Sequence, residues 1–374
     1  MKKSTFKENN QQIFRWMFKI FVIWRIGLEL VVFLGKKILP EKLDYLGPSV
    51  WANFDGVYYL NIAQNGYGLY QQAFFPFYPF LIRWLSNFIH NYLVSGLLIS
   101  HLAFLGALVF LYKLLTLDYS PKFIKLVIIG LLLFPASFYF VSVYTESLFL
   151  FFVLGAFYFI RIKKWWLGGV FGAFASATRI VGIFLLPALL IEWWEDKKIL
   201  NFKFKILNLI FLFLIPLGLI FYMRYLLVHY GDPLLFIHVQ PHFGAQRSGG
   251  KIILLYQVFW RYFKMILTTK IDPLYFVVWL ELLVAISFLG LLVYGYLKKI
   301  RLSYLVFGFL AYILPTLTGT FSSLPRYVLV VFPAFLSLGF ILEKYQRFKI
   351  FYLIFSLILL VISLIFFSRG YWLA

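Results

Sequence analysis

Cysteine is absent from this 374-residue chain, and acidic residues are scarce, with 14 Asp and Glu against 35 Lys and Arg. The lack of cysteine excludes a disulfide framework, thiolate metal sites and a cysteine nucleophile. The five histidines are scattered without the spacing of a zinc motif, so we expect no dedicated zinc site. Charged residues make up 13% of the chain, about half of their usual share in a soluble domain.

Hydrophobic residues are abundant instead, at 63% of the chain, with a mean hydropathy of +0.89. A water-soluble fold of about 300 residues buries only roughly 75% of its unfolded surface, too little to hide so many apolar side chains. The composition excludes a soluble enzyme, a coiled coil, a disordered chain and a secreted disulfide-rich domain. It predicts an all-α polytopic membrane protein.

The formal net charge of +21 would indicate nucleic-acid binding in a soluble protein, but here the basic residues flank apolar stretches. This is the pattern of cytoplasmic loops, and no basic stripe lies on a soluble domain, so we expect no nucleic-acid partner. The basic segment Met1–Lys19 lacks the short apolar core and small-residue site of a cleaved secretory signal.

Apolar stretches long enough to cross a bilayer, about 17–25 residues, recur along the chain. They are Phe14–Leu34, Tyr92–Leu115, Phe123–Val141, Thr145–Ile162, Ile206–Val228, Leu274–Leu297, Leu302–Thr320, Val328–Leu342 and Ile350–Phe367. In the first stretch Arg25 and Glu29 are four residues apart, so they share a helix face and can pair.

The stretch Leu167–Trp194 has 28 residues, which is long for one span and short for two. With the N-terminus in the cytoplasm, two short helices that reverse near Arg179 keep the basic segment 197–205 cytoplasmic, whereas one span would place it outside. The positive-inside rule therefore favours a hairpin and about eleven membrane helices, with the C-terminus outside. Arg179 then lies at the outer face instead of in lipid.

Two long outer loops, 35–91 and 229–273, belong to this single domain of residues 1–374. In the first loop, Ala73–His90 combines an aromatic run with Pro76 and Pro79 and predicts a short interfacial helix. Its aromatic side chains could anchor the loop in the headgroup layer, stack on a sugar or flank an isoprenoid chain.

Asp55 stands out among the few carboxylates because it lies in the first outer loop among aromatic and amide side chains. A partly desolvated carboxylate there is a usable general base. The spacing alone favours the other interpretation, in which Asp55 caps the helix that begins at Gly56.

A second candidate site is the corner Tyr144-Thr145-Glu146-Ser147 between two predicted spans. Glu146 could bind a sugar hydroxyl or orient a basic residue. The alternative is that Thr145 caps the following helix and that Glu146 favours its N-terminal dipole.

Outer cations form the third candidate group. Arg179 and Arg326 suit bidentate binding of a phosphate, and the second loop adds His242, Arg247 and Lys251. The alternative for each is a contact with a lipid headgroup. For Arg179, inside an apolar hairpin, a position facing a cavity is favoured.

These residues carry a resemblance to a known family. The segments from Asp55-Gly56-Val57-Tyr58-Tyr59-Leu60 to Gly66-Tyr67 and Ala73-Phe74-Phe75-Pro76-Phe77-Tyr78-Pro79 resemble the first-loop motifs of the PIG-V family, the GPI mannosyltransferase II proteins and their prokaryotic relatives. Pro135-Ala136-Ser137 with Tyr144–Phe149, Ala177-Thr178-Arg179 with Gly182, and Pro325-Arg326-Tyr327 are similar to further family motifs in the same order.

The resemblance implies a GT-C glycosyltransferase fold and an inverting transfer of a sugar, with mannose expected, from a polyprenyl-phosphate donor. The first-loop Asp of the family is the catalytic base, and Asp55 matches it, so the resemblance favours catalysis over the cap. The predicted donor-phosphate ligands are Arg179, Arg326 and Arg247. The predicted substrate-binding residues are Asn61, Gln64, Tyr67, Phe75, Tyr78, Tyr144, Glu146 and His242.

The chain departs from the family pattern at two places. Phe54 replaces the Trp before the Asp, and Ile180-Val181 replaces the Ser-Asn after the hairpin Arg, which leaves the acceptor open as a lipid, a glycan or a protein. We expect an enzyme of a prokaryotic plasma membrane that faces outward, or of the luminal face of the ER if the source is eukaryotic. We expect no cofactor, with a divalent metal ion left open. The alternatives are a GT-C enzyme for another sugar, a lipid-linked-sugar flippase or transporter, and a non-catalytic scaffold.

Overall fold

The computed structural model describes residues 2–42, 46–196 and 202–373, and this part of the chain contains helices and no strand. The α-helices are α1 Lys2–Ile38, α2 Asp55–Asn65, α3 Phe77–Ile89, α4 Tyr92–Leu115, α5 Pro121–Leu132, α6 Glu146–Arg161, α7 Trp165–Thr178, α8 Leu185–Glu195, α9 Phe202–Leu212, α10 Leu217–Tyr230, α11 Leu235–His238, α12 Leu255–Thr268, α13 Pro273–Leu297, α14 Leu302–Thr316, α15 Leu324–Tyr327, α16 Phe332–Lys344 and α17 Gln346–Ser368. Short 3₁₀ turns are η2 Val50–Ala52, η3 Gln71–Ala73, η4 Ser137–Val141, η5 Ile180–Phe184, η6 Gln240–Phe243 and η7 Val328–Val330.

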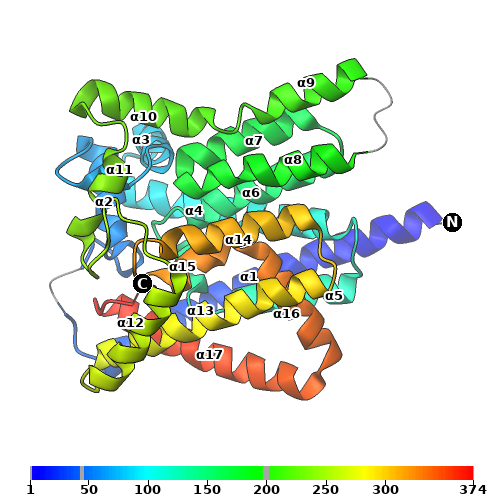
Figure 1. The fold of residues 1–374 in the computed structure, drawn as a ribbon. Coiled ribbons are helices and arrows are strands. Elements are labelled where there is room, and N and C mark those ends of the chain that lie inside the picture. Colours follow the sequence, from blue (N-terminus) through cyan, green and yellow to red (C-terminus); the bar gives the residue numbers. More distant parts are fainter. Residues whose placement is uncertain (1, 43–45, 197–201, 374) are drawn as a thin grey trace.

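The long helices run side by side and give the molecule two distinct ends (Figure 1). The N-terminus and the connections α4–α5, α6–α7, α13–α14 and α16–α17 lie at one end, which we call the basic end. The opposite end, which we call the loop end, holds α2, α3, α11, α12 and α15. Basic residues of the connections thus gather at one end, as a common cytoplasmic side requires.

The predicted hairpin within Leu167–Trp194 is confirmed, because α7 and α8 are separate helices joined by η5 at the loop end. Arg179 stands at the reversal, as the C-cap of α7. Gly182 makes the tight reversal possible. A Cβ atom there would lie 2.4 Å from the backbone carbon of Ala175, closer than any side chain tolerates.

Several predicted spans are interrupted. The stretch 123–141 leaves the α-helix after Leu132, just before Pro135, and continues as the 3₁₀ turn η4. The stretch 328–342 bends by 85° before Pro333, and 206–228 bends by 41° between α9 and α10. Proline removes a backbone donor and crowds the preceding turn, which accounts for the break before Pro135.

By length and composition, three helices in the described residues are long and apolar enough to cross a membrane, or up to five if each bent pair counts as one span. Two of the three, Tyr92–Leu115 and Leu274–Leu297, were predicted with these bounds. The first predicted span lies in α1, where Arg25 and Glu29 form the expected ion pair at 2.6 Å.

The helices at the rim of the bundle turn apolar side chains outward. On α1, α13 and α17 the exposed residues include Ile26, Ile286 and Phe351, all with more than half of their surface accessible. By contrast, α6 is almost wholly buried between α4 and α7. An apolar core with an apolar rim is the arrangement of a helical protein embedded in a membrane.

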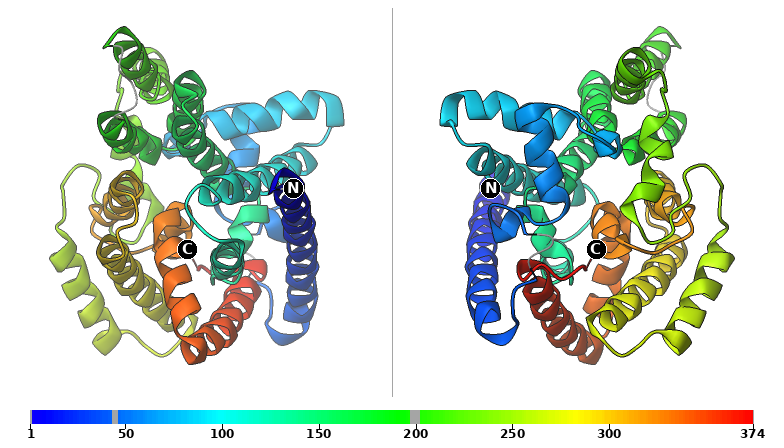
Figure 2. Two further views of the ribbon diagram at one scale, coloured as in Figure 1. Left: turned by 90° about the vertical axis from the view of Figure 1, so that its right-hand side faces the viewer. Right: turned by 90° about the vertical axis from the view of Figure 1, so that its left-hand side faces the viewer.

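Two amphipathic helices lie across the bundle at the loop end (Figure 2). The first is α3, in the segment where an interfacial helix was predicted, and it exposes Phe80, Trp84 and Phe88 along one face. The second is α12, inside the second long loop. The helix in 73–90 is therefore confirmed, and its place in the headgroup layer stays a prediction.

Candidate active site

Asp55 is presented by a strained turn. It is the first residue of α2, and Phe54 before it has φ 55° and ψ −116°, a conformation that side chains rarely adopt. The buried amide of Asn53 fixes the turn, because its Oδ1 accepts the Gly47 N–H at 2.9 Å and its Nδ2 donates to the Phe367 carbonyl at 2.9 Å. No side-chain hydrogen bond caps α2, so the cap interpretation of Asp55 is wrong.

Arg326 lies opposite Asp55, on α15. Its Nη1 donates to Asp55 Oδ2 at 2.5 Å across 271 residues of sequence. The short helix α15 begins after Ser323, which has a left-handed backbone with φ 67°. Two unusual backbone positions thus aim a carboxylate and a guanidinium at each other.

Glu146 and Arg179 extend this pair into a cluster. Arg179 Nη1 donates to Glu146 Oε1 at 2.8 Å, and Arg326 Nε lies 3.5 Å from the same oxygen. We call Asp55, Glu146, Arg179 and Arg326 the charge cluster. Two cations and two anions from four separate elements alternate within it.

Glu146 is the first residue of α6 and is 1% exposed. The N-terminal dipole of α6 stabilises its charge, as one alternative predicted. Thr145 makes no capping hydrogen bond; its hydroxyl lies 3.4 Å from the hydroxyl of Tyr59. Thr145 therefore occupies the predicted N-cap position of α6, but the predicted capping hydrogen bond is absent, and its hydroxyl lies against Tyr59 instead.

Aromatic rings enclose the charge cluster. The guanidinium of Arg326 lies 5.2 Å from the ring centre of Tyr144 and 5.1 Å from that of Tyr327. Arg179 lies 5.2 Å from the same Tyr327 ring. Cation–π attraction is stronger in such a desolvated place, so the rings hold both arginines.

Tyr59 on α2 also borders the cluster. Burial raises the pKa of the Tyr59 phenol, and the nearby charges of Glu146 and Asp55 raise it further. The phenol therefore stays protonated at neutral pH and can donate a hydrogen bond.

The charge cluster is incompletely paired. Among the described residues, Arg326 Nε and Glu146 Oε2 are buried and make no hydrogen bond. Buried polar atoms without a partner are costly and usually mark strain or a function. The side chains of Asp55 and Arg179 remain 17% and 14% exposed, so a polar ligand can reach the cluster.

Arg247, the third predicted phosphate ligand, contacts the turn that precedes Arg326 and not Arg326 itself. Its Nη2 donates to Ser323 Oγ at 3.2 Å, at the turn that begins α15. His242, in η6, stacks on Tyr70 with ring centres 3.6 Å apart. Arg247 therefore lies at the edge of the charge cluster. His242 joins the second long loop to the first by stacking on Tyr70.

The predicted substrate-binding residues occupy different places in the structure. Tyr144 lines the charge cluster and donates from its hydroxyl to the Asn53 carbonyl at 2.8 Å. A second group joins the first loop to itself and to neighbouring helices. Tyr78 is fully buried and bonds to Ser100 at 2.8 Å, Tyr67 donates to the Phe74 carbonyl at 2.6 Å, and Phe75 packs on Tyr222 with ring centres 4.9 Å apart.

Asn61 and Gln64 lie on α2 beyond the turn of Asp55. The Oδ1 of Asn61 accepts a hydrogen bond from Asn65 at 2.7 Å, and Gln64 is exposed. They follow Asp55 by six and nine residues, roughly 9 and 14 Å along the helix axis.

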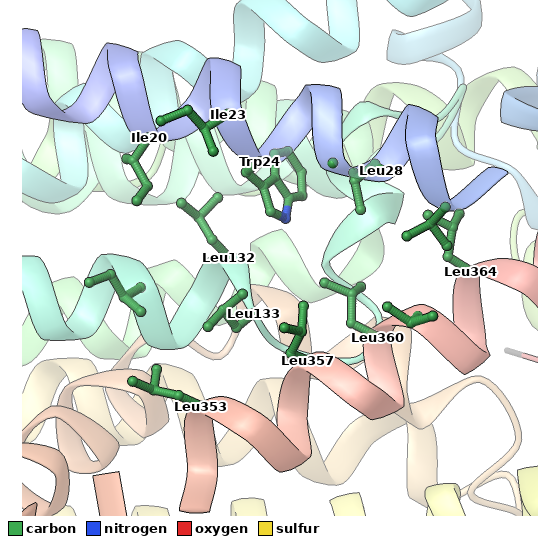
Figure 3. A pocket seen from close by; sticks show the side chains of 14 residues that line it. Ile20, Ile23, Trp24, Leu28, Leu132, Leu133, Leu353, Leu357, Leu360 and Leu364 are labelled. Carbon is green, nitrogen blue, oxygen red and sulfur yellow. The ribbon is translucent and has the colours of Figure 1, made fainter. Parts of the chain in front are cut away.

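An apolar cavity of about 420 Å³ lies between α1, α5 and α17, lined by leucine, isoleucine, valine, glycine and one tryptophan (Figure 3). Ile23 and Leu357 at its edge are largely exposed, so it opens toward the lipid side. Leu364 lines one end, and Phe367, one turn further, packs on Phe54 with ring centres 5.9 Å apart. The cavity therefore ends close to the turn that presents Asp55.

Three residues near the site were not predicted for any role. Tyr59 and Tyr327 lie beside the charge cluster. Both belong to or adjoin the family-like motifs, so the motifs could have indicated them. Glu281, buried in α13, accepts the backbone N–H of Ser323 at 3.2 Å. The sequence feature that could have indicated Glu281 is that it is a lone carboxylate inside an apolar span. In the described residues, no three His, Cys, Asp or Glu side chains lie together as metal ligands.

Comparison of the chain with family models, with curated proteins and with solved structures found no match. The resemblance to the PIG-V family rests on the quoted motifs alone.

Proposed function

We propose that this chain is an inverting GT-C glycosyltransferase similar to the PIG-V family. It moves a sugar, with mannose expected, from a polyprenyl-phosphate donor to an extracytoplasmic lipid, glycan or protein acceptor. The observation that carries the proposal is the pairing of Asp55 with Arg326 inside the charge cluster. A carboxylate that caps no helix, held by a buried arginine beside incompletely paired atoms, suits a general base next to an anion site.

In the proposed reaction Asp55 takes the proton of the acceptor hydroxyl. The acceptor oxygen forms a bond to the anomeric carbon as the bond from that carbon to the phosphate oxygen breaks, on the opposite face of the sugar. The polyprenyl phosphate leaves with the bonding electron pair. Arg179 and Arg326 stabilise the charge on the leaving phosphate.

The ion pair between Asp55 and Arg326 gives the donor a second role. While Arg326 Nη1 donates to Asp55 Oδ2, that oxygen is engaged and is not free to accept the proton of the acceptor hydroxyl. A donor phosphate competes for Arg326, so donor binding frees Asp55 for the acceptor. This order of events would limit proton transfer in the absence of donor.

The cavity between α1, α5 and α17 supports a lipid-linked substrate. It is apolar, open toward lipid, and ends beside the turn of Asp55. An isoprenoid chain in the cavity would place its phosphate near the loop end. The proposed topology has eleven passes, with the N-terminus in the cytoplasm and the loop end outside.

The position of the charge cluster also favours a transferase over a flippase or transporter. Transport sites lie near the bilayer midplane, often between two repeated halves. Here Asp55, Glu146 and Arg326 gather at helix ends, and no internal repeat is visible in the sequence.

The direct test is transfer of radiolabelled sugar from polyprenyl-phosphate mannose by the full-length protein in proteoliposomes. We expect transfer by the wild type and a loss of about 10²-fold or more in Asp55→Asn, the usual contribution of a general base. The matched control is Asp232→Asn, an outer-loop carboxylate paired with His238, which should keep wild-type transfer.

Both variants should show the wild-type elution profile and thermal stability before rates are compared. Equal transfer by Asp55→Asn and wild type would contradict the role of Asp55. Absence of transfer from every polyprenyl-phosphate sugar tried would contradict the enzyme class.

A further inference from the structure

Helix α12 has two opposite faces. Tyr256, Trp260, Phe263 and Leu267 follow a 4-3-4 spacing, and each is more than half exposed. Such spacing places them along one side of a helix. Val258 and the ring of Tyr262 face the other way and are fully buried. An exposed apolar stripe of this length does not suit contact with water.

The depth of α12 follows from its link to α13. Residues 269–272 join the two helices and can separate them by at most roughly 18 Å. The Tyr262 hydroxyl donates to Glu281 Oε2 at 2.5 Å. Glu281 lies seven residues past Leu274, about 10 Å along α13. The inner face of α12 therefore meets α13 within the apolar span and not above it.

The chemistry of the outer face matches a bilayer surface. Trp and Tyr prefer the headgroup layer. Exposed Lys264 lies 5.9 Å from the ring centre of Trp260, and exposed Lys251 and Lys270 flank the helix. Cations next to an apolar stripe complement anionic headgroups.

The inner face of α12 connects to the turn that carries Arg326. Tyr262 bonds Glu281 Oε2, and Glu281 Oε1 accepts the N–H of Ser323, the residue that begins α15. Arg261 adds a second connection, since it donates to the Gly319 carbonyl at 3.0 Å. A displacement of α12 would therefore move the turn before Arg326.

We propose that α12 is a membrane-surface helix whose aromatic stripe is seated at the boundary between lipid headgroups and acyl chains, and that Tyr262 and Glu281 are positioning residues through which it holds the Arg326 turn. The seating is independent of the proposed transferase activity. The effect of the connection on turnover rests on that activity.

The seating can be tested with single-cysteine variants, because the chain has no native cysteine and each introduced thiol is unique. Trp260→Cys and Phe263→Cys would be spin-labelled in the full-length protein, reconstituted in an equimolar mixture of phosphatidylcholine and phosphatidylglycerol. We expect both labels to collide more with oxygen than with a water-soluble nickel complex.

Two glycines provide matched references, since a Cβ at either position meets no atom within 4 Å. Gly290→Cys on α13 should report the hydrocarbon, and Gly250→Cys in the loop before α12 should report water. Labels at 260 and 263 that behave like the label at 250 would overturn the seating.

The connection can be tested by hydrogen exchange in the same bilayers. Tyr262→Phe removes one hydroxyl and keeps the ring that packs on Phe321. We expect exchange in the segment 320–327 to rise at least several-fold. Tyr256→Phe, an exposed tyrosine of the same helix, should leave it unchanged. Unchanged exchange in Tyr262→Phe would overturn the connection whether or not the chain is a transferase.

For the transfer reaction, Tyr262→Phe should raise the donor KM more than it lowers kcat. Glu281→Gln keeps an acceptor oxygen for Ser323 and should retain most of the turnover that Glu281→Ala loses. Equal losses in Gln and Ala variants would overturn the positioning role of Glu281.

Discussion

The two ends of the bundle each hold ion pairs, and the two sets are built differently. At the basic end, Arg161 donates two hydrogen bonds to the carboxylate of Asp118, at 2.7 and 2.8 Å. Arg301 likewise donates two hydrogen bonds to the carboxylate of Glu192, at 2.9 and 2.8 Å. Ser303 adds a third hydrogen bond to Glu192. Asp118 and Glu192 thus each pair with one arginine, and both oxygens of each carboxylate accept a hydrogen bond from it.

At the loop end the pairing is shared and incomplete. Glu146 Oε1 faces both Arg179 and Arg326, while Glu146 Oε2 and Arg326 Nε make no hydrogen bond in the described structure. The backbone before Asp55 is strained as well. Bidentate pairs fasten helices together, whereas unpaired buried atoms and strain persist where a ligand uses them. We therefore infer a structural role for the ion pairs of the basic end and propose a ligand-binding role for the charge cluster.

The largest expected difference separates the arginines of the two ends. Arg326→Gln should lower sugar transfer by about 10²–10³-fold, the usual cost of removing one donor to a developing oxyanion. Arg301→Gln should transfer at nearly the wild-type rate. Steady-state rates in proteoliposomes measure both, and a loss in Arg301→Gln as large as in Arg326→Gln would erase the distinction between the ends.

The next effect concerns stability at the basic end. Glu192→Gln should lower the free energy of unfolding by about 1–3 kcal/mol, less than for a fully buried pair because Arg301 is one-third exposed. Detergent-induced unfolding measures the change. Glu195→Gln is the control, since its carboxylate is 3.8 Å from Arg301 and half-exposed. If Glu192→Gln lost sugar transfer while its free energy of unfolding stayed unchanged, Glu192 would act in the reaction and not in holding the helices together.

A smaller effect is expected at the edge of the site. Arg247→Gln should raise the donor KM by roughly tenfold, the worth of one hydrogen bond to a charged group, with little change in kcat. Lys251→Gln, an exposed cation of the same loop, should leave both constants unchanged. A titration of donor concentration distinguishes the two, and equal KM values would remove Arg247 from the site.

The smallest effect belongs to an exposed pair outside both sets. The hydrogen bond from His238 lowers the pKa of Asp232. A depressed pKa contributes stability above the ordinary pKa of Asp that is lost as the pH falls through the folded-state value. We expect a slight fall in melting temperature below about pH 4 that Asp232→Asn lacks. A large fall in the melting temperature of the wild type below about pH 4, absent in Asp232→Asn, would show that this exposed pair contributes as much stability as the pairs at the basic end.

Local features of the sequence predicted much of the fold. Apolar length predicted α4 and α13 with their bounds, and loop charge predicted the α7–α8 hairpin. Spacing predicted the pair of Arg25 and Glu29 within α1. The stretch 123–141 was predicted as one helix because its composition is apolar throughout, although Pro135 ends it early. The amphipathic helix α12 was not predicted, although the 4-3-4 spacing of its large apolar residues is present in the sequence.

The site was predicted as a set of residue types and not as an arrangement. The sequence marked Asp55 as a base and Arg326 as a phosphate ligand, without their contact. It assigned Tyr78 and Phe75 to the substrate, whereas in the structure Tyr78 bonds to Ser100 of α4 and Phe75 packs on Tyr222 of α10. Aromatic side chains serve equally in cores and in binding sites, so only their neighbours decide which role they take.

The amino-acid sequence by itself determined that this chain is a helical membrane protein, because apolar length and the scarcity of charge are properties of local segments. It also determined where the reversal at Arg179 falls, since charge on the flanking segments restricts the topology. Only the tertiary structure decided that Asp55 meets Arg326, that Glu146 is shared by two arginines, and that Tyr262 reaches Glu281. Those contacts join segments distant in sequence, and the packing of the helices sets their geometry.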